Sequence, residues 1–211
     1  MPTRLRTLRQ PVIAPLSTRA MRRLLLLATL SFLPTLAVAQ ASTVPFPVKL
    51  DPVGFQDALA RVGDNLWIAG QPTEAAMRKL KTDGITTVIS LRAPQEHANR
   101  AAVPYDEAAL AAELGIRWIN IPVRGDSLYP YSPEAVDAFA KALDGAKGEK
   151  VLVHCTIAYR ASHMYTAFLV RYRGLPLEEA SRHGRAINLG AMPLEGLLGG
   201  PVTLSQPAAK H

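Results

Sequence analysis

The residues best suited to covalent chemistry lie in one short stretch of this 211-residue chain. Cys155 is its only cysteine, and Arg160 follows after four intervening residues. An apolar run at 151–153 comes before the cysteine, and a helix-like segment at 161–173 follows the arginine. This order predicts a strand, a tight loop and the N-terminus of a helix.

Such a position favours a reactive thiolate. The unpaired N–H groups and the positive dipole of a helix N-terminus bind anions and stabilise a thiolate. The planar guanidinium of Arg160 can hold two oxygens of a phosphate or sulfate at once. We therefore interpret Cys155 as a covalent nucleophile for phosphoryl or sulfur transfer. A plain buried thiol is the alternative, and His154 either supports the thiolate and its loop or is structural.

Strands alternate with helices along the chain, and this alternation indicates the fold. We expect strands at 66–69, 86–91, 117–121 and 151–154, and helices at 74–82, 107–114, 133–143, 161–173 and 177–187, with a loop at 92–102. The pattern is typical of a single α/β domain, a three-layer sandwich with a mostly parallel central sheet. Ligands of such sheets bind at the carboxyl ends of the strands. Cys155, Arg92 and the segment 122–126 each follow a strand, so we expect them to converge.

Residues 1–39 have the pattern of a secretory signal peptide. A charged start at Met21 is followed by an apolar run at 24–36 and by small residues up to Ala39. The apolar run is short for a membrane span, although an uncleaved anchor is the alternative. Either the charged segment before the apolar run is long or translation begins at Met21, and in both cases we expect cleavage after Ala39. The mature protein would then be periplasmic or secreted, with no stable membrane association.

The leader also explains the basic charge of the chain. The whole chain carries +7, from 24 basic and 17 acidic residues. Six of the arginines lie in residues 1–39, so 18 basic residues remain against 17 acidic ones, a net charge of +1. A domain this close to neutral predicts no nucleic-acid partner.

Four segments resemble the cysteine-dependent protein-tyrosine and dual-specificity phosphatase superfamily: 64–72, 88–92, 121–123 and 153–160. The branch most similar is the bacterial one related to the phosphatase-like domain of β-lactamase-hydrolase-like proteins. The resemblance implies a phosphatase-like domain over 62–188. It also implies hydrolysis of phosphate monoesters through a cysteinyl-phosphate on Cys155, without metal or cofactor. Arg160 would clamp the phosphate in a cradle of backbone N–H groups from Thr156, Ile157, Ala158, Tyr159, Arg160 and Ala161.

Around this domain we expect two less regular segments. Residues 40–61, with Pro45 and Pro47 opposing helix, are interpreted as a linker and N-terminal segment, and residues 189–211 as an irregular C-terminal tail. The expected partner is a phosphorylated protein or small molecule, and the protein is expected to be a monomer.

Asp126 is the candidate general acid, because a phosphate monoester releases a basic oxygen that must be protonated. It follows Ile121-Pro122-Val123 at the place where the family carries its loop aspartate. A turn aspartate beside Gly125 is the competing interpretation. Asp106 and Glu96 are the next candidates.

The loop departs from the usual superfamily pattern in three ways. Four residues separate Cys155 from Arg160 where five are usual, and Ile157-Ala158 stands where a Ser-Gly pair is common. If the backbone at Ala158 is left-handed, alanine costs about 1–2 kcal/mol there. Arg160 is followed by alanine where many phosphatases carry Ser or Thr, so assistance to the leaving thiolate would fall to Ser162 or be absent.

These departures keep two other functions open. The four-residue spacing also occurs in rhodanese-like sulfurtransferases, which would carry a persulfide on Cys155. The Ile157-Ala158 pair leaves room for a non-catalytic phosphate-binding relative. No metal site is expected, since His97, His163 and His183 lack metal-ligand spacing.

Overall fold

The computed structural model describes residues 44–190 and 194–202. The strands are β1 (Val48–Leu50), β2 (Leu59–Val62), β3 (Leu66–Ala69), β4 (Ile85–Ser90), β5 (Arg117–Asn120) and β6 (Lys150–His154). The helices are α1 (Glu74–Thr82), α2 (Pro94–Ala98), α3 (Glu107–Glu113), α4 (Pro133–Asp144), α5 (Tyr159–Arg173), α6 (Leu177–Arg185) and α7 (Leu194–Leu198). Helices α1, α3 and α4 begin where the sequence predicts, because Thr73, Asp106 and Ser132 cap them through their side-chain oxygens.

The sheet brings four loops to one edge. Its six strands lie in the order β1-β2-β3-β6-β4-β5, with β3, β6, β4 and β5 parallel and β1 and β2 antiparallel beside them. The carboxyl ends of the parallel strands therefore meet. Gly70, Leu91, Ile121 and Cys155 follow directly after these four strands.

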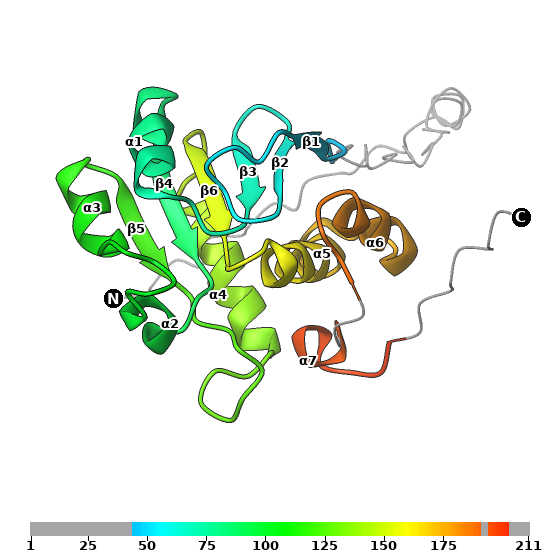
Figure 1. The fold of residues 1–211 in the computed structure, drawn as a ribbon. Helices are drawn as coiled ribbons and strands as arrows, with labels where there is room; N and C mark the ends of the chain where they lie inside the picture. The colour runs from blue at the N-terminus through cyan, green and yellow to red at the C-terminus, as the bar shows by residue number, and fades with distance from the viewer. Residues whose placement is uncertain (1–43, 191–193, 203–211) are drawn as a thin grey trace, which may run out of the picture. The chain divides into compact units, whose positions relative to one another are not determined.

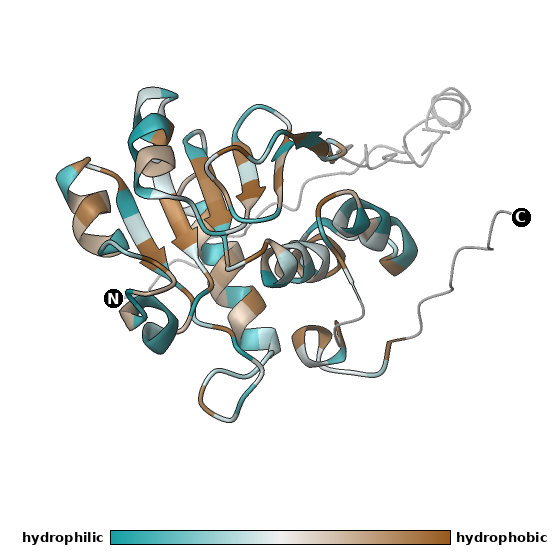
Figure 2. Ribbon diagram, in the orientation of Figure 1, coloured by the Kyte–Doolittle hydropathy of each residue, from teal (hydrophilic) through white to brown (hydrophobic). Residues whose placement is uncertain are grey.

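Helices cover both faces of the sheet and make the expected three layers (Figure 1). On one face α1 and α3 bury Met77 and Leu110 against the sheet. On the other face α4 and α5 bury Phe139 and Phe168, and α6 and α7 pack beside them. Hydrophobic residues concentrate on the central strands, while the outer surface of α1 is hydrophilic (Figure 2). The α/β sandwich with a mostly parallel sheet is thus confirmed.

Several predicted boundaries are corrected. Residues 40–61 contain β1 and β2 rather than only a linker, and the tail from 189 contains α7. The three residues of β1, Val48-Lys49-Leu50, are too few for their alternation to reveal a strand. The expected loop at 92–102 contains α2. Helix α5 begins at Tyr159, two residues earlier than expected, which puts Arg160 in its first turn.

The predicted signal peptide at 1–39 lies outside the described residues, as do 191–193 and 203–211 of the tail. Within the described ranges, no helix is long and apolar enough to cross a membrane.

Candidate active site

Cys155 lies where β6 ends, between the ends of its two neighbouring strands. Its N–H donates to the carbonyl of Ala69 on β3 at 3.3 Å. On the other side, the N–H of Leu91 donates to the carbonyl of His154 at 2.9 Å. The cysteine residue is 1% exposed and forms no disulfide. Backbone contacts with both neighbouring strands therefore fix the thiol at the predicted edge of the sheet.

The loop after the cysteine turns into α5 through a left-handed residue. Ala158 has φ 63° and ψ −3°, which is the left-handed backbone conformation expected to be costly for alanine. The carbonyl of Ala158 accepts the first helical bond, from Ser162 N–H at 2.8 Å. Residues 159–161 open α5, so their N–H groups have no carbonyl partner in the preceding turn. This arrangement supplies the anion-binding end of a helix next to Cys155.

Arg160 is held in one orientation by the ends of two strands and by a carboxylate. Its Nη1 donates to the carbonyl of Val123 at 2.8 Å and to Glu96 Oε2 at 2.8 Å. Its Nη2 donates to Glu96 Oε1 at 2.6 Å and to Thr156 Oγ1 at 2.9 Å. Among the described residues, the Nε–H of Arg160 has no partner. The Nε–H is therefore free to donate to a ligand, while the contacts of Nη1 and Nη2 hold the guanidinium in place.

Glu96 is the carboxylate that orients Arg160. It also accepts from the N–H of Ala93 at 2.8 Å and from the hydroxyl of Thr156 at 3.2 Å. Burial alone would raise the pKa of Glu96, but hydrogen bonds from Arg160 and Ala93 and the charge of Arg160 outweigh it and lower the pKa to about 2. An ionised carboxylate that accepts this many hydrogen bonds has no proton to give to a leaving group. Glu96 therefore acts as a positioning residue rather than a general acid in this arrangement.

A second carboxylate lies next to His154, and this one is fully buried. Glu107, at the start of α3, is 2% exposed. It accepts from His154 Nε2 at 2.8 Å, Trp118 Nε1 at 2.8 Å and Gln71 Nε2 at 2.6 Å. Burial would raise the pKa of Glu107, but the attraction of His154 and these hydrogen bonds hold it at about 2. The network fixes the ring of His154, whose Nδ1 lies 3.3 Å from the carbonyl oxygen of Cys155.

Arg92 extends this network toward the nucleophile. Its Nη1 donates to Gln71 Oε1 at 2.6 Å, and its Nη2 donates to the carbonyl of Glu96 at 2.9 Å. The residue is 3% exposed, and burial lowers its pKa. Arg92 thus links Gln71, which donates to Glu107, to the backbone of Glu96, whose carboxylate holds Arg160.

The structure separates the predicted site residues into two groups. Cys155, Arg160 and the loop between them lie together. Asp126 instead serves its own loop: Oδ1 accepts from the N–H groups of Leu128 and Tyr129, and Oδ2 lies 2.7 Å from Arg124 Nε. No hydrogen bond or ion pair between described residues joins Asp126 to Cys155 or Arg160. Its role as the acid remains a prediction.

Two further assignments change with the structure. Ser162 Oγ donates to the carbonyl of Tyr159 at 2.7 Å, so its hydroxyl serves the helix and is not free to assist a leaving thiolate. The hydroxyl that lies within the loop belongs to Thr156, which accepts from Arg160 and donates to Glu96. Asp106 caps α3 through Ala109 N–H and pairs with Arg100, so it is engaged elsewhere.

The loop from Cys155 to Arg160, the expected phosphate loop, is also held in place at its exposed side. Asn188 Nδ2 donates to the carbonyl of Ile157 at 2.6 Å and to Asp57 Oδ2 at 2.9 Å. Gly70 lies against the loop so closely that a side chain there would collide with the carbonyl of Gln56 and lie 2.9 Å from that of Thr156. Glycine is therefore required at this position. Among the described residues, no group of three His, Cys, Asp or Glu side chains is placed to hold a metal ion.

Comparison with known proteins identifies the family. Residues 51–193 match the family model described as a DSP-PTPase phosphatase fused to NAD+ kinase. The chain therefore belongs to this family. It is a cysteine-dependent phosphatase of the protein-tyrosine and dual-specificity type, and the resemblance inferred from its motifs is confirmed.

Solved structures agree with this phosphatase family. A DUF442 protein from Shewanella putrefaciens CN-32 is 31% identical, with 70% of this chain and 91% of that chain covered and a TM-score of 0.55. Two more distant structures share the fold: P. aeruginosa TpbA in complex with pTyr and PTPMT1 in complex with PI(5)P. TpbA is 15% identical, covering 68% of this chain and 80% of its own, with a TM-score of 0.52. PTPMT1 is 20% identical, covering 64% and 88%, with a TM-score of 0.53. No curated protein matches the chain.

Sequence reasoning missed most of the residues that position this phosphatase site. Glu96 was considered only as a substitute acid, and Glu107 was not considered. Their neighbourhood in the chain is that of exposed helix-start acids, which suit the helix dipole wherever they occur. The one available signal was Gln71, a polar residue two positions after a strand, within a segment that resembles the family.

Proposed function

We propose that this phosphatase hydrolyses phosphate monoesters through a cysteinyl-phosphate intermediate, outside the cytoplasm. The observation that carries the mechanism is the placement of Cys155 directly before the N-terminus of α5, with Arg160 fixed in the first turn by Glu96 and Val123. Nucleophile, helix N-terminus and guanidinium belong to one continuous loop. They can therefore act on the same phosphoryl group.

In the first step the thiolate sulfur of Cys155 attacks phosphorus, and the bond from phosphorus to the leaving oxygen breaks. The helix N–H groups and Arg160 stabilise the charge on the equatorial oxygens during transfer. The leaving oxygen takes a proton from an acid, for which Asp126 is the candidate. In the second step water attacks phosphorus, the sulfur–phosphorus bond breaks, and the acid regains a proton from that water.

Two observations support a phosphate monoester as the substrate. The solved complexes of TpbA and PTPMT1 hold pTyr and PI(5)P, which have an aryl and an alkyl phosphate monoester respectively. A cradle built mainly from backbone N–H groups recognises the phosphoryl group rather than the rest of the ester. The proposed location outside the cytoplasm depends on the signal-peptide pattern at 1–39.

One assay on the purified protein tests this function. The wild-type enzyme and Cys155→Ser are compared for aryl-phosphate hydrolysis and for sulfur transfer from thiosulfate to cyanide. We expect phosphate release from the wild type only, with orthovanadate still binding to Cys155→Ser because Arg160 and the N–H groups remain. Acid quenching of the wild type with labelled substrate should trap phosphate on Cys155. Sulfur transfer without phosphate release would instead assign the chain to persulfide chemistry.

The location has a separate test. Expression of the full chain in a bacterial host, followed by fractionation and mass spectrometry, should give a soluble periplasmic protein that begins at Gln40. An intact segment 21–39 on membrane-bound protein would contradict the proposed export.

A further inference from the structure

One carbonyl of the phosphate loop is held by a side chain from a distant part of the chain. The carbonyls on either side of it are bonded by backbone groups: that of Thr156 accepts from the N–H of Gln71 at 2.8 Å, and that of Ala158 accepts the first helical bond of α5. The carbonyl of Ile157 accepts instead from Asn188 Nδ2 at 2.6 Å. The direction of the peptide group between Ile157 and Ala158 therefore depends on Asn188.

The direction of this peptide group decides what the loop presents to a phosphate. The peptide bond is trans and planar, so its carbonyl oxygen and its N–H point in opposite directions. Ile157 is 38% exposed and Ala158 is fully buried. Because the Ile157 oxygen is held at the exposed side, the N–H of Ala158 points to the inner side of the loop. In the reversed orientation a carbonyl oxygen would take that place and repel both the phosphate oxygens and the thiolate of Cys155.

Alanine at position 158 favours this reversed orientation. Its φ of 63° is left-handed and costly for a residue with a Cβ atom. Rotating the peptide plane by half a turn would bring φ of Ala158 to about −120°, on the side that L-residues favour. Glycine would have no such preference. This loop therefore needs a contact that keeps the N–H inward, and the hydrogen bond from Asn188 supplies it.

The amide of Asn188 is itself oriented by a carboxylate. Its Nδ2 also donates to Asp57 Oδ2 at 2.9 Å, so the nitrogen of the amide, not its oxygen, faces the loop. Asp57 has φ 71° and lies in a strained γ-turn, in which the N–H of Ala58 donates to the carbonyl of Gln56 at 2.9 Å. Asp57 is exposed, so burial of its side chain in the core does not account for the strain. Strained backbone of this kind is typical of functional sites.

We propose that Asn188 is a positioning residue of the phosphatase. Its amide, oriented by Asp57, holds the Ile157 carbonyl outward, so that the loop presents the N–H of Ala158 to the phosphoryl group rather than an oxygen. The contact offsets the preference of alanine for the reversed peptide. This role rests on the proposed function, because the loop that Asn188 orients is the one that binds the phosphoryl group there.

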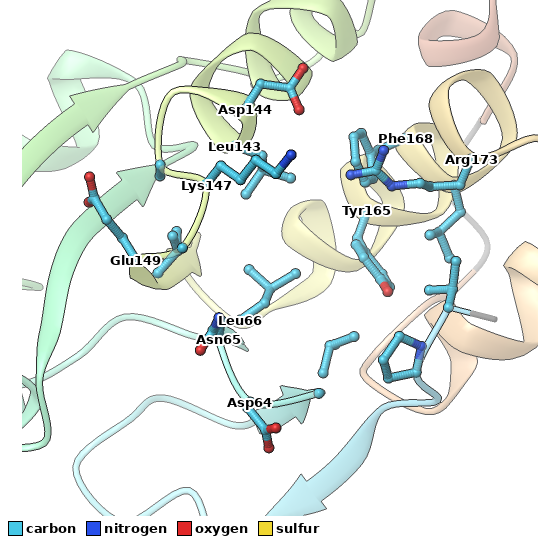
Figure 3. A pocket seen from close by; sticks show the side chains of 18 residues that line it. Asp64, Asn65, Leu66, Leu143, Asp144, Lys147, Glu149, Tyr165, Phe168 and Arg173 are labelled. Atoms are coloured by element: carbon cyan, nitrogen blue, oxygen red, sulfur yellow. The ribbon is translucent and has the colours of Figure 1, made fainter. Parts of the chain in front are cut away.

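The test measures orthovanadate affinity and kcat/KM for 4-nitrophenyl phosphate in the full chain. Asn188→Ala should lower both by about tenfold, because nothing then opposes the strain at Ala158. The matched control is Asn65→Ala, which should leave both unchanged. Asn65 is an exposed asparagine on the wall of a cavity at the opposite end of β3 (Figure 3).

Two further comparisons separate positioning from a purely structural role. Ala158→Gly added to Asn188→Ala should restore both quantities to within about threefold of wild type, since glycine accepts the left-handed backbone without strain. Asp57→Asn keeps an acceptor for the amide and tolerates a positive φ, so it should match wild type. Asp57→Gly keeps the backbone but removes the acceptor, and it should lower orthovanadate affinity about threefold. A purely structural role would not be rescued by removing a methyl group from the loop.

Other results would overturn the proposal. They are wild-type affinity in Asn188→Ala, no recovery on adding Ala158→Gly, or equal effects of the two Asp57 substitutions. If Asn188→Ala does not fold, Asp57→Gly gives the same comparison with Asn188 in place.

The affinity series repeated in Cys155→Ser keeps this proposal apart from the proposed function, because it measures binding without chemistry. Absence of phosphate release by the wild type, with the affinity ratios unchanged, would refute the catalysis and support the role of Asn188. Phosphate release by the wild type and equally by Asn188→Ala would refute the role of Asn188 alone.

Discussion

Replacing Glu107 by glutamine tests the network behind the cysteine loop. The two carboxylate oxygens receive three donors: His154 and Trp118 on Oε1, and Gln71 on Oε2. Glutamine has a single acceptor oxygen, so its NH₂ group must face one of these donors. Gln71 cannot rotate its amide to accommodate that group without losing the bond from Arg92 to its own oxygen. The substitution therefore leaves a buried donor unpaired, although the side-chain volume barely changes.

The size of the effect follows from the pKa of Glu107. Its folded pKa of about 2, against an ordinary value of 4.5, corresponds to about 3 kcal/mol at 1.36 kcal/mol per unit. An unpaired buried donor costs about 1–3 kcal/mol, and this cost overlaps in part with the loss that corresponds to the pKa shift. We expect Glu107→Gln to lower the free energy of unfolding by about 3–4 kcal/mol. For a domain of this size, that lowers Tm by about 10 °C.

Urea unfolding of wild type and Glu107→Gln measures this difference, with Glu113→Gln as the control. Glu113 lies on the same helix but is exposed, and it pairs with Arg78 at 2.9 Å. Its replacement should cost less than about 1 kcal/mol, as for other surface pairs. A control substitution as costly as Glu107→Gln would show that any change in α3 destabilises the fold.

The pH dependence gives a second measurement. Because folding depresses the pKa of Glu107, its stabilisation is fully present above the ordinary value near 4.5 and is lost as pH falls toward about 2. The difference between wild type and Glu107→Gln measured at pH 5 should shrink as the pH falls below about 4.5. A loss under about 1 kcal/mol, or a difference unchanged down to pH 2, would refute the assignment of a buried, ionised carboxylate.

Three further predictions concern the phosphate loop. Arg160→Lys should lower kcat/KM about 100-fold for aryl and alkyl phosphates alike, because one ammonium cannot keep the contacts to Glu96 and Val123 and also present a donor where the Nε–H of Arg160 lies; a loss confined to one ester would contradict phosphate clamping. Ala158→Gly should change stability by less than about 1 kcal/mol in urea unfolding, since relief of about 1–2 kcal/mol of left-handed strain offsets about 0.8 kcal/mol of buried methyl. Ala158→Val, the matched comparison, should be clearly less stable, and equal stability of the two would show that the left-handed backbone carries no strain. If Asp126 is the acid, Asp126→Asn should slow alkyl phosphates strongly and a nitrophenyl ester little, because only the alkoxide needs the proton; equal effects on both esters would move the acid elsewhere.

The sequence predicts the reacting residues of this site better than the residues that hold them in place. Cys155, Arg160 and the strand before them are adjacent in the chain, so local patterns specify the loop and its place at the sheet edge. The left-handed backbone at Ala158 could also be anticipated, because the position normally carries glycine. Likewise, the strands that cross the core are recognisable from their apolar, β-branched residues, as in β4 and β6.

The positioning residues cannot be found from sequence patterns, because their roles depend on contacts between residues far apart in the chain. Glu96 meets Arg160 across 64 residues, and Glu107 meets His154 across 47. Before folding, each of these acids is one helix-start residue among several, and only burial distinguishes it. The short elements β1 and α7 were missed for a related reason. Three exposed residues and a five-residue helix carry too little periodicity to be seen without their packing partners.

The charges around Cys155 also explain how a nearly neutral domain can bind a phosphate dianion. Two guanidinium groups, the buried Arg92 and the half-buried Arg160, are matched by two carboxylates, the half-buried Glu96 and the buried Glu107. The cluster therefore offers little net attraction over long distances, in contrast to proteins that attract anions with a positive surface. Selectivity must come from local donors: the N–H groups that open α5 and the Nε–H of Arg160 belong to the same first turn of the helix, directly after the cysteine loop. The carboxylates are then part of recognition, because Arg160 can present its Nε–H only while Glu96 and Val123 hold its other nitrogens.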